Sequence, residues 1–290
     1  MGLQEIINAL CLAGIYACVG MGFSLLYGIM NIINLAHGAM VMLGAYITFW
    51  MFELWGVDPL LSIPIVMAMV FCVGYLMQKY FINNVIKSDI LNALMITYGF
   101  QLLILGFALF IWKSDYRAIT TSYYAASLKF AGVIVPYTKL IILAIAVALT
   151  LALRAFMNKT RVGMSLKATS LNKESAQLVG INIRRAYAIS CGIGCAIAGA
   201  AGSLVAVSYT ITPTTEGTYL GSAFVIAVLG GLGNVTGAIV GGIVLAFVET
   251  IGALYLGMSF QKFIGFAILL LVLVFRPYGL VGRQFYAERK

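Results

Sequence analysis

Long runs of apolar residues dominate this 290-residue chain and constrain its fold more than any other feature. Eight of them cover residues 6–30, 39–52, 60–78, 90–112, 140–157, 186–208, 235–256 and 258–275. Most are long enough to cross the hydrocarbon core of a bilayer as a helix, which needs roughly 20 residues. Only 9% of the residues are charged and the mean hydropathy is +1.03, whereas about one-quarter of a soluble domain is charged. The sequence therefore predicts an all-α, polytopic membrane protein with about eight transmembrane helices.

A ninth apolar run, residues 219–232, is shorter and ends at a Gly/Asn break. Its length suits a half-helix, a re-entrant segment or a short span. A short span is favoured because the C-terminal tail then reaches the same side as the basic loops. We treat residues 1–290 as a single transmembrane domain.

Charge bias predicts which loops face the cytoplasm. Arg154 to Arg185 contain seven Lys or Arg against one acid, and the tail from Arg276 contains four against one. By the positive-inside rule, loop 158–185 and the C-terminus are cytoplasmic, loop 113–138 is external, and the turn around Asn31 lies near the inner side. Residues 113–139 do not fit this charge rule, because they hold four basic residues and one acid yet are placed outside. Within this loop, Tyr123 to Val135 resemble a small β-hairpin.

Several other functions find no support in the sequence. The five cysteines lie inside apolar runs and lack zinc-type partners, and His37, the only histidine, is better explained as a hydrogen-bonded structural residue than as a metal ligand. The net charge of +9 comes from residues that flank the spans, so no nucleic-acid partner is expected. No phosphate-binding loop or hydrolase motif is present, so we expect no catalytic residue, no metal and no cofactor.

Two glycine-rich breaks interrupt the apolar runs, one at Tyr27–Gly38 and one at Leu229–Gly237. Lipid cannot satisfy free backbone N–H and C=O groups, so irregular backbone in a membrane is buried in protein or lines a water-filled cavity. Paired breaks commonly mark the substrate region of a transporter, although plain helix ends are the alternative. The predicted pathway residues in the breaks are Asn31, Asn34, His37, Gly38, Gly230, Gly231, Gly233 and Asn234.

Glu249 lies within the apolar run 238–256, where a carboxylate is costly. A place on the pathway and a structural hydrogen-bonding role are both open. Small residues also recur every fourth position, at Gly233, Gly237 and Gly241 and at Cys195, Gly199 and Ser203. Such stripes allow helices to approach closely, and we expect them to pack within the chain.

The polar insertion Arg161–Arg185 reads as a short capped helix on a basic loop. Asn172 suits the N-cap, Glu174 falls in the first turn, and Gly180 follows the last turn. A helix this short is marginal in water unless something packs against it, which favours a docking element for a partner on the same side of the membrane. An ordinary solvated loop is the alternative.

Three blocks of the sequence resemble the permeases of branched-chain amino acid ABC importers, the LivH type. They are Asn31–Gly38 with Met42–Tyr46, Gly163–Ala168 through Gly180–Ile183, and Val228–Ala238 through Gly241 to Glu249. The resemblance runs nearly end to end. It implies a bacterial inner-membrane protein surrounded by lipid, a second related permease subunit, two ATPase subunits that bind the ATP, and a periplasmic binding protein for hydrophobic amino acids.

The resemblance also assigns a role to the capped helix, because such importers seat a cytoplasmic coupling helix in a groove of the ATPase. The expected contact residues are Leu171, Asn172, Lys173, Glu174, Ser175 and Ala176. Permeases for urea, short amides and aromatic acids share the same blocks, so these substrates stay open. A gradient-driven carrier working alone and a membrane assembly subunit without transport activity are the remaining alternatives.

Overall fold

The computed structural model describes residues 2–85, 90–120, 127–130 and 133–281 of the chain. Its elements are α1 (Leu3–Met30), α2 (His37–Trp55), α3 (Pro59–Met77), η1 (Gln78–Ile82), α4 (Asn83–Val85), α5 (Ile90–Trp112), β1 (Ser127–Phe130), β2 (Val133–Pro136), α6 (Tyr137–Lys159), α7 (Arg161–Leu171), α8 (Lys173–Leu178), α9 (Ile183–Ser208), α10 (Thr215–Gly230), α11 (Val235–Leu256), η3 (Met258–Phe260) and α12 (Gln261–Phe275). The described residues contain eight helical segments long and apolar enough to cross a membrane. The prediction of an all-α polytopic membrane protein is confirmed.

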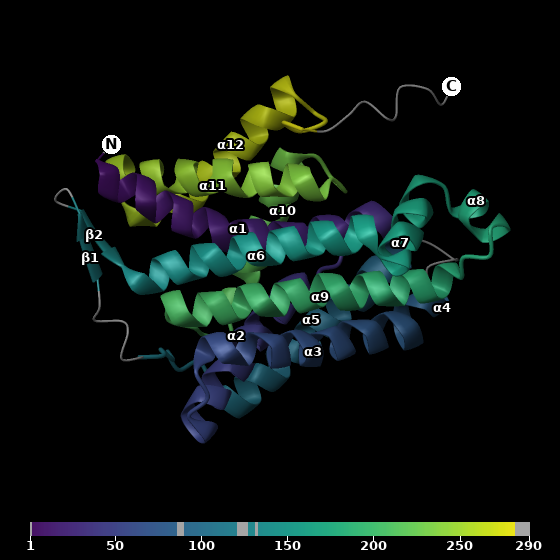
Figure 1. Cartoon of the computed structure of the whole chain (residues 1–290), viewed down its shortest axis with the longest axis horizontal. Helices are drawn as coiled ribbons and strands as arrows, with labels where there is room; N and C mark the ends of the chain where they lie inside the picture. The colour runs from purple at the N-terminus through teal and green to yellow at the C-terminus, as the bar shows by residue number, and fades with distance from the viewer. Residues whose placement is uncertain (1, 86–89, 121–126, 131–132, 282–290) are drawn as a thin grey trace.

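The long helices run side by side, so the bundle has two ends (Figure 1). The short helices α7 and α8 project at one end, which we call the elbow end, and strands β1 and β2 lie at the other, the hairpin end. Helix α1 starts at the hairpin end and finishes at the elbow end. At the elbow end, the chain after α12 packs against the turn after α10, where Leu280 N–H donates to the Leu229 carbonyl oxygen at 2.7 Å.

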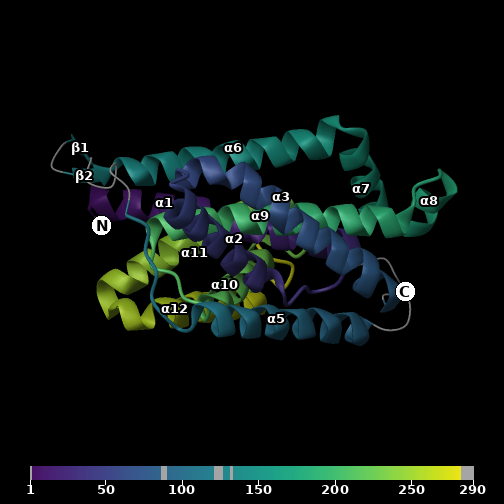
Figure 2. The same ribbon diagram turned by 90° about the horizontal axis from the view of Figure 1, so that it is seen from below.

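Helices α1 and α9 are the most buried spans and form the centre of the bundle, whereas α5 and the segment η3–α12 are the most exposed. Figure 2 shows α6 along one face of the bundle and α5 along the opposite face. The centre is held by close backbone contact at small residues. A Cβ on Gly44 would lie 2.2 Å from the Gly199 carbonyl oxygen, and one on Gly202 would lie 2.0 Å from that of Val41. Only glycine fits there.

The small-residue stripes pack within the chain, as expected. Gly237 meets Gly230, Gly241 meets the Ile226 backbone, and Ser203 shares a 2.7 Å hydrogen bond with Thr48. These contacts join α10 to α11 and α2 to α9.

Helix α10, which contains most of the short ninth run, has 16 residues. That corresponds to about 24 Å, less than the roughly 30 Å of a hydrocarbon core. It ends in the turn 231–234 at the elbow end, where Gly233 packs against Gly28 near the end of α1. The helix therefore continues the alternation of the chain between the two ends, although it is preceded by irregular backbone at residues 209–214.

The predicted hairpin corresponds to β1 and β2, which pair antiparallel with Ser127 opposite Pro136; residues 123–126 and 131–132 lie outside the described residues. Arg117 in this loop and Lys139 at the start of α6 both have partners within the protein. The Arg117 guanidinium lies over the rings of Phe49 and Trp50, and Lys139 Nζ donates to Asn8 Oδ1 at 2.6 Å. Such contacts explain how a basic loop can occupy the end opposite α7 and α8.

Candidate functional site

The first break carries the chain back into the bundle. Helix α1 ends at the elbow end, where Asn31 adopts a left-handed conformation with φ of 55°. Residues 31–36 are irregular, and α2 starts at His37, whose Nε2 lies 3.0 Å from the Val19 carbonyl oxygen. Because Val19 precedes the end of α1 by about 16 Å of helix, α2 begins deep inside the bundle.

A second irregular stretch, residues 209–214, enters from the opposite end. Ile211 and Arg117 exchange backbone hydrogen bonds of 3.0 and 2.8 Å, which fixes the stretch near the hairpin end just beyond α5. Five residues after Ile211, the side chain of Glu216 accepts a 3.0 Å hydrogen bond from Gln101 Nε2. Gln101 is the middle residue of α5, so α10 also begins at depth.

The starts of α2 and α10 touch each other. A Cβ on Gly38 would lie 2.2 Å from the Glu216 carbonyl oxygen, so glycine permits the contact. Thr97, one turn before Gln101 on α5, accepts a hydrogen bond from Leu35 N–H at 3.3 Å. We call this region the helix-start junction and define it by Asn34, His37, Gly38, Thr97, Gln101 and Glu216.

Polar atoms at the junction are buried without partners. Asn34 Nδ2, His37 Nδ1 and Glu216 Oε2 have no hydrogen-bond partner among the described residues, although the other polar atom of each side chain has one. Neither helix start has a side-chain cap, and a helix N-terminus carries partial positive charge. Because a carbonyl oxygen only accepts, His37 Nε2 donates to Val19 and the neutral imidazole leaves Nδ1 as an acceptor. Buried polar groups are normally satisfied, so Asn34 Nδ2 offers a donor and His37 Nδ1 and Glu216 Oε2 offer acceptors to a polar group.

The structure divides the predicted pathway residues into groups. Asn34, His37 and Gly38 lie together at the junction, whereas Asn31 is exposed and ends α1. The second break forms the turn between α10 and α11 at the elbow end, and it contains Gly230, Gly231, Gly233 and Asn234. Asn234 caps α11 by accepting from Gly237 N–H at 3.0 Å. This turn therefore has the form of two plain helix ends, the alternative considered for the break. A pathway role for its residues stays a prediction.

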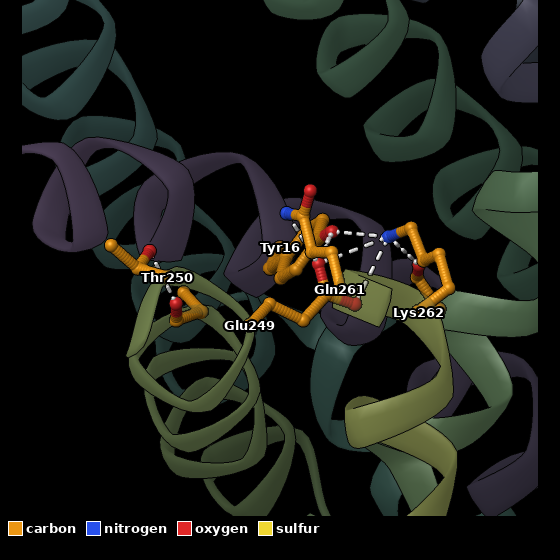
Figure 3. Close-up of polar contacts among 7 residues, drawn as sticks. Tyr16, Glu249, Thr250, Gln261 and Lys262 are labelled. Carbon is orange, nitrogen blue, oxygen red and sulfur yellow. Dashed lines mark hydrogen bonds and ion pairs between the residues drawn. The ribbon is translucent and has the colours of Figure 1, made fainter. Parts of the chain in front are cut away.

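Glu249 belongs to a separate buried cluster (Figure 3). Its Oε1 lies 3.0 Å from Lys262 Nζ, and its Oε2 accepts from Tyr16 Oη at 2.6 Å and from Gln261 Nε2 at 3.1 Å. Lys262 also donates to Ser222 Oγ at 3.1 Å. The cluster joins α1, α10, α11 and α12, which gives the carboxylate a structural role. Its pathway role stays a prediction.

A cavity of about 280 Å³ lies beside this ion pair. Its walls include Ser222, Glu249, Lys262 and the apolar side chains Leu245 and Phe266. No group of three or more His, Cys, Asp and Glu side chains suited to a metal ion occurs among the described residues.

Sequence reasoning missed Lys262 and Glu216. Lys262 lies inside an apolar run and Glu216 lies just before one. Because a charge within a membrane span is expected to have a partner or a function, the sequence could have singled out both residues. Gln101 and Thr97 carried no such signal, because isolated polar residues are common in long spans and only the fold brings these two to Glu216 and Leu35.

The helix caps predicted for the polar insertion are confirmed in α8, at the projecting elbow. Asn172 Oδ1 accepts from Ser175 N–H at 2.9 Å, Glu174 lies in the first turn of α8, and Gly180 adopts φ of 84°. Leu171 is 82% exposed and Leu178 is 89% exposed, whereas Ala176 is only 2% exposed. Ala176 therefore packs inside the elbow, and the exposed apolar surface of the elbow comes from Leu171, Leu178 and Val179.

The bundle, its internal helix starts and its projecting elbow define a multi-pass membrane protein. The chain belongs to the family described as branched-chain amino acid transport system, permease component, whose sequence profile matches residues 5–273.

Similar proteins cover nearly the whole chain. It is 30% identical to the high-affinity branched-chain amino acid transport system permease protein LivH of Escherichia coli K12 and 29% identical to the corresponding protein BraD of Pseudomonas aeruginosa, in both cases over 97% of this chain and 96% of the relative. A probable permease protein LivH of Methanocaldococcus jannaschii is 26% identical over 95% of this chain and 91% of its own length.

The fold is shared with a chain of PsaBC from Streptococcus pneumoniae. That chain was solved in complex with Fab; the match has a TM-score of 0.51 and 10% identity, and it covers 92% of this chain and 90% of that one.

Proposed function

We propose that this chain is the membrane-spanning subunit of an ABC importer that translocates branched-chain and other hydrophobic amino acids delivered by a periplasmic binding protein. A second related permease and two ATP-binding subunits complete the importer in the bacterial inner membrane. The elbow end and the C-terminus then face the cytoplasm, because the basic loop 158–185 lies at the elbow end. Support for the substrate class comes from the relatives, whose names specify branched-chain amino acids.

The observation that carries this proposal is the elbow. Helix α8 has six residues, and the apolar side chains Leu171, Leu178 and Val179 around it have little cover from the rest of the chain. An ATPase groove would bury these side chains and stabilise a helix too short to persist alone. The elbow lies at the same end as the turn 231–234 and the end of α1. In the proposed importer, movement of α8 is passed on to these segments, which lead into α2 and out of α10.

A second permease would cover the outer faces of α5 and α12. Both spans expose most of their apolar surface, including Leu103, Phe107, Phe263 and Leu270. Lipid can cover such faces too. Co-purification of two differently tagged permeases therefore provides the test of this partner.

Replacement of Leu178 by aspartate tests ATPase docking. A charge at this exposed position would have to be desolvated in an apolar groove, and we expect at least a tenfold loss of ATPase co-purification, equivalent to about 1.4 kcal/mol. Leu54→Asp is the matched control, because Leu54 is 64% exposed and lies at the end of α2, away from the elbow. Equal co-purification of the two variants would exclude α8 as the docking element.

Two further measurements separate the alternatives. Vesicles that contain this chain alone should not accumulate solute, whereas a gradient-driven carrier would do so. The compounds retained by the cognate binding protein decide between hydrophobic amino acids and urea, short amides or aromatic acids.

A further inference from the structure

We infer that Glu216 binds the ammonium group of the substrate at the helix-start junction, so that the permease itself selects zwitterionic amino acids. The inference rests on the proposed function and deepens it, since it assigns a recognition role to the membrane subunit in addition to the binding protein.

Glu216 has no oppositely charged partner among the residues that the structure describes. Its side chain is buried, with 5% of the residue exposed, yet the neutral amide of Gln101 is its only hydrogen-bond donor in the described part of the chain. Within the described residues, the ion pairs are Arg117–Asp115 and Lys262–Glu249, and Glu216 belongs to neither. A buried carboxylate is costly unless it is paired, and Glu249, with Lys262, Tyr16 and Gln261 around it, shows how this chain satisfies one.

The surroundings of Glu216 suit the rest of a zwitterion. Among the described residues, no group donates to Glu216 Oε2. A substrate ammonium would donate a hydrogen bond to this atom and would also balance the negative charge of the carboxylate. The uncapped starts of α2 and α10 meet beside it and carry partial positive charge, and Asn34 Nδ2 is a buried donor with no partner in the part of the chain that the structure describes. These groups suit a carboxylate, so the junction offers complementary partners to both charges of an α-amino acid.

The depth of the junction fits a transport site. Gln101 lies at the middle of α5, and both helix starts are reached by irregular backbone from opposite ends of the bundle. Transporters commonly place substrate sites near the bilayer midplane at interrupted helices. Urea and short amides carry no positive charge, and an aromatic acid without an amino group carries none either, so none of them would neutralise Glu216.

Uptake by the complete importer in proteoliposomes tests the inference, with L-leucine as the substrate and the cognate binding protein present. Glu216→Gln preserves the shape of the side chain but removes its charge. At low leucine concentration we expect uptake to fall about 10- to 100-fold, the range for loss of a hydrogen bond to a charged group. Glu53→Gln, which neutralises an exposed acid at the end of α2, should retain wild-type uptake.

The pair Glu216→Asp and Glu216→Asn compares charge at equal length and keeps the test valid if the Gln variant fails to assemble. The Asp variant should transport at least tenfold faster than the Asn variant. Equal uptake by these two, or wild-type uptake by Glu216→Gln, overturns the inference and leaves the proposed function intact. A wild-type importer that hydrolyses ATP but moves no leucine refutes the proposed substrate class and the inference with it.

A labelling measurement on the wild-type chain needs neither variants nor the binding protein. Excess L-leucine should slow carbodiimide modification of Glu216, followed by mass spectrometry, whereas urea and 4-methylpentanoate should not. Equal protection by all three compounds, or by none, contradicts ammonium binding.

Discussion

Lys262→Met should lower the free energy of unfolding of the isolated chain by about 3–5 kcal/mol, the usual cost of leaving a buried charge without its partner. The variant leaves Glu249, whose side chain is 2% exposed, without a countercharge inside the bundle. Tyr16 and Gln261 still donate to the carboxylate, but both are neutral at pH 7. Unfolding in detergent can be followed by thiol labelling, because four of the five cysteines are buried and react only when the bundle opens.

The reverse substitution should cost less. Glu249→Leu leaves Lys262, whose side chain is 40% exposed and can turn its ammonium group toward the surface. The double variant should recover much of the loss, since replacing both members of a buried pair by apolar residues is often close to neutral. Equal costs for the two single variants, or strictly additive costs in the double variant, would contradict a structural ion pair.

Gly202→Leu should destabilise the bundle by about 3 kcal/mol or more, at the upper end of the range for overpacking a core. A Cβ at this position would lie 2.0 Å from the Val41 carbonyl oxygen and 2.8 Å from Ala45 N. These obstacles are backbone atoms of α2, so they cannot rotate aside as a flexible side chain would, and α2 and α9 must separate. Less folded chain and faster thiol labelling are the expected measurements.

Gly99→Leu is the matched control, because Gly99 is an exposed glycine of α5 and a Cβ there meets no atom within 4 Å. It should unfold like the wild-type chain in detergent. If Gly99→Leu proved as damaging as Gly202→Leu, the cost would come from the general effect of the larger residue and not from helix contact.

The separation of α2 from α9 would also matter for transport. Helix α2 begins at the junction, where His37 and Gly38 contact α1 and α10. A shift of this helix changes the position of Asn34 and the contact with Glu216, so the packing of small residues and the geometry of the pathway are coupled.

The sequence by itself determined the membrane spans, the caps of α8 and the small-residue stripes. These features depend on residues close together in the chain: hydropathy over some 20 positions, a cap three residues from its partner, and side chains one helical turn apart. The break before α2 was also visible, because the Asn-rich and Gly-rich segment stands out between apolar runs.

Only the tertiary structure decided how deep inside the bundle α2 and α10 begin and which polar residues contact each other. Residues 209–216 lie between two apolar runs, and their entry into the bundle depends on the bridge of Ile211 to Arg117 and on the contact of Glu216 with Gln101. Lys262 meets Glu249 and Tyr16 because α1, α11 and α12 pack together. Such pairings join residues up to 246 positions apart, and no local pattern records them, since they follow from how whole helices pack.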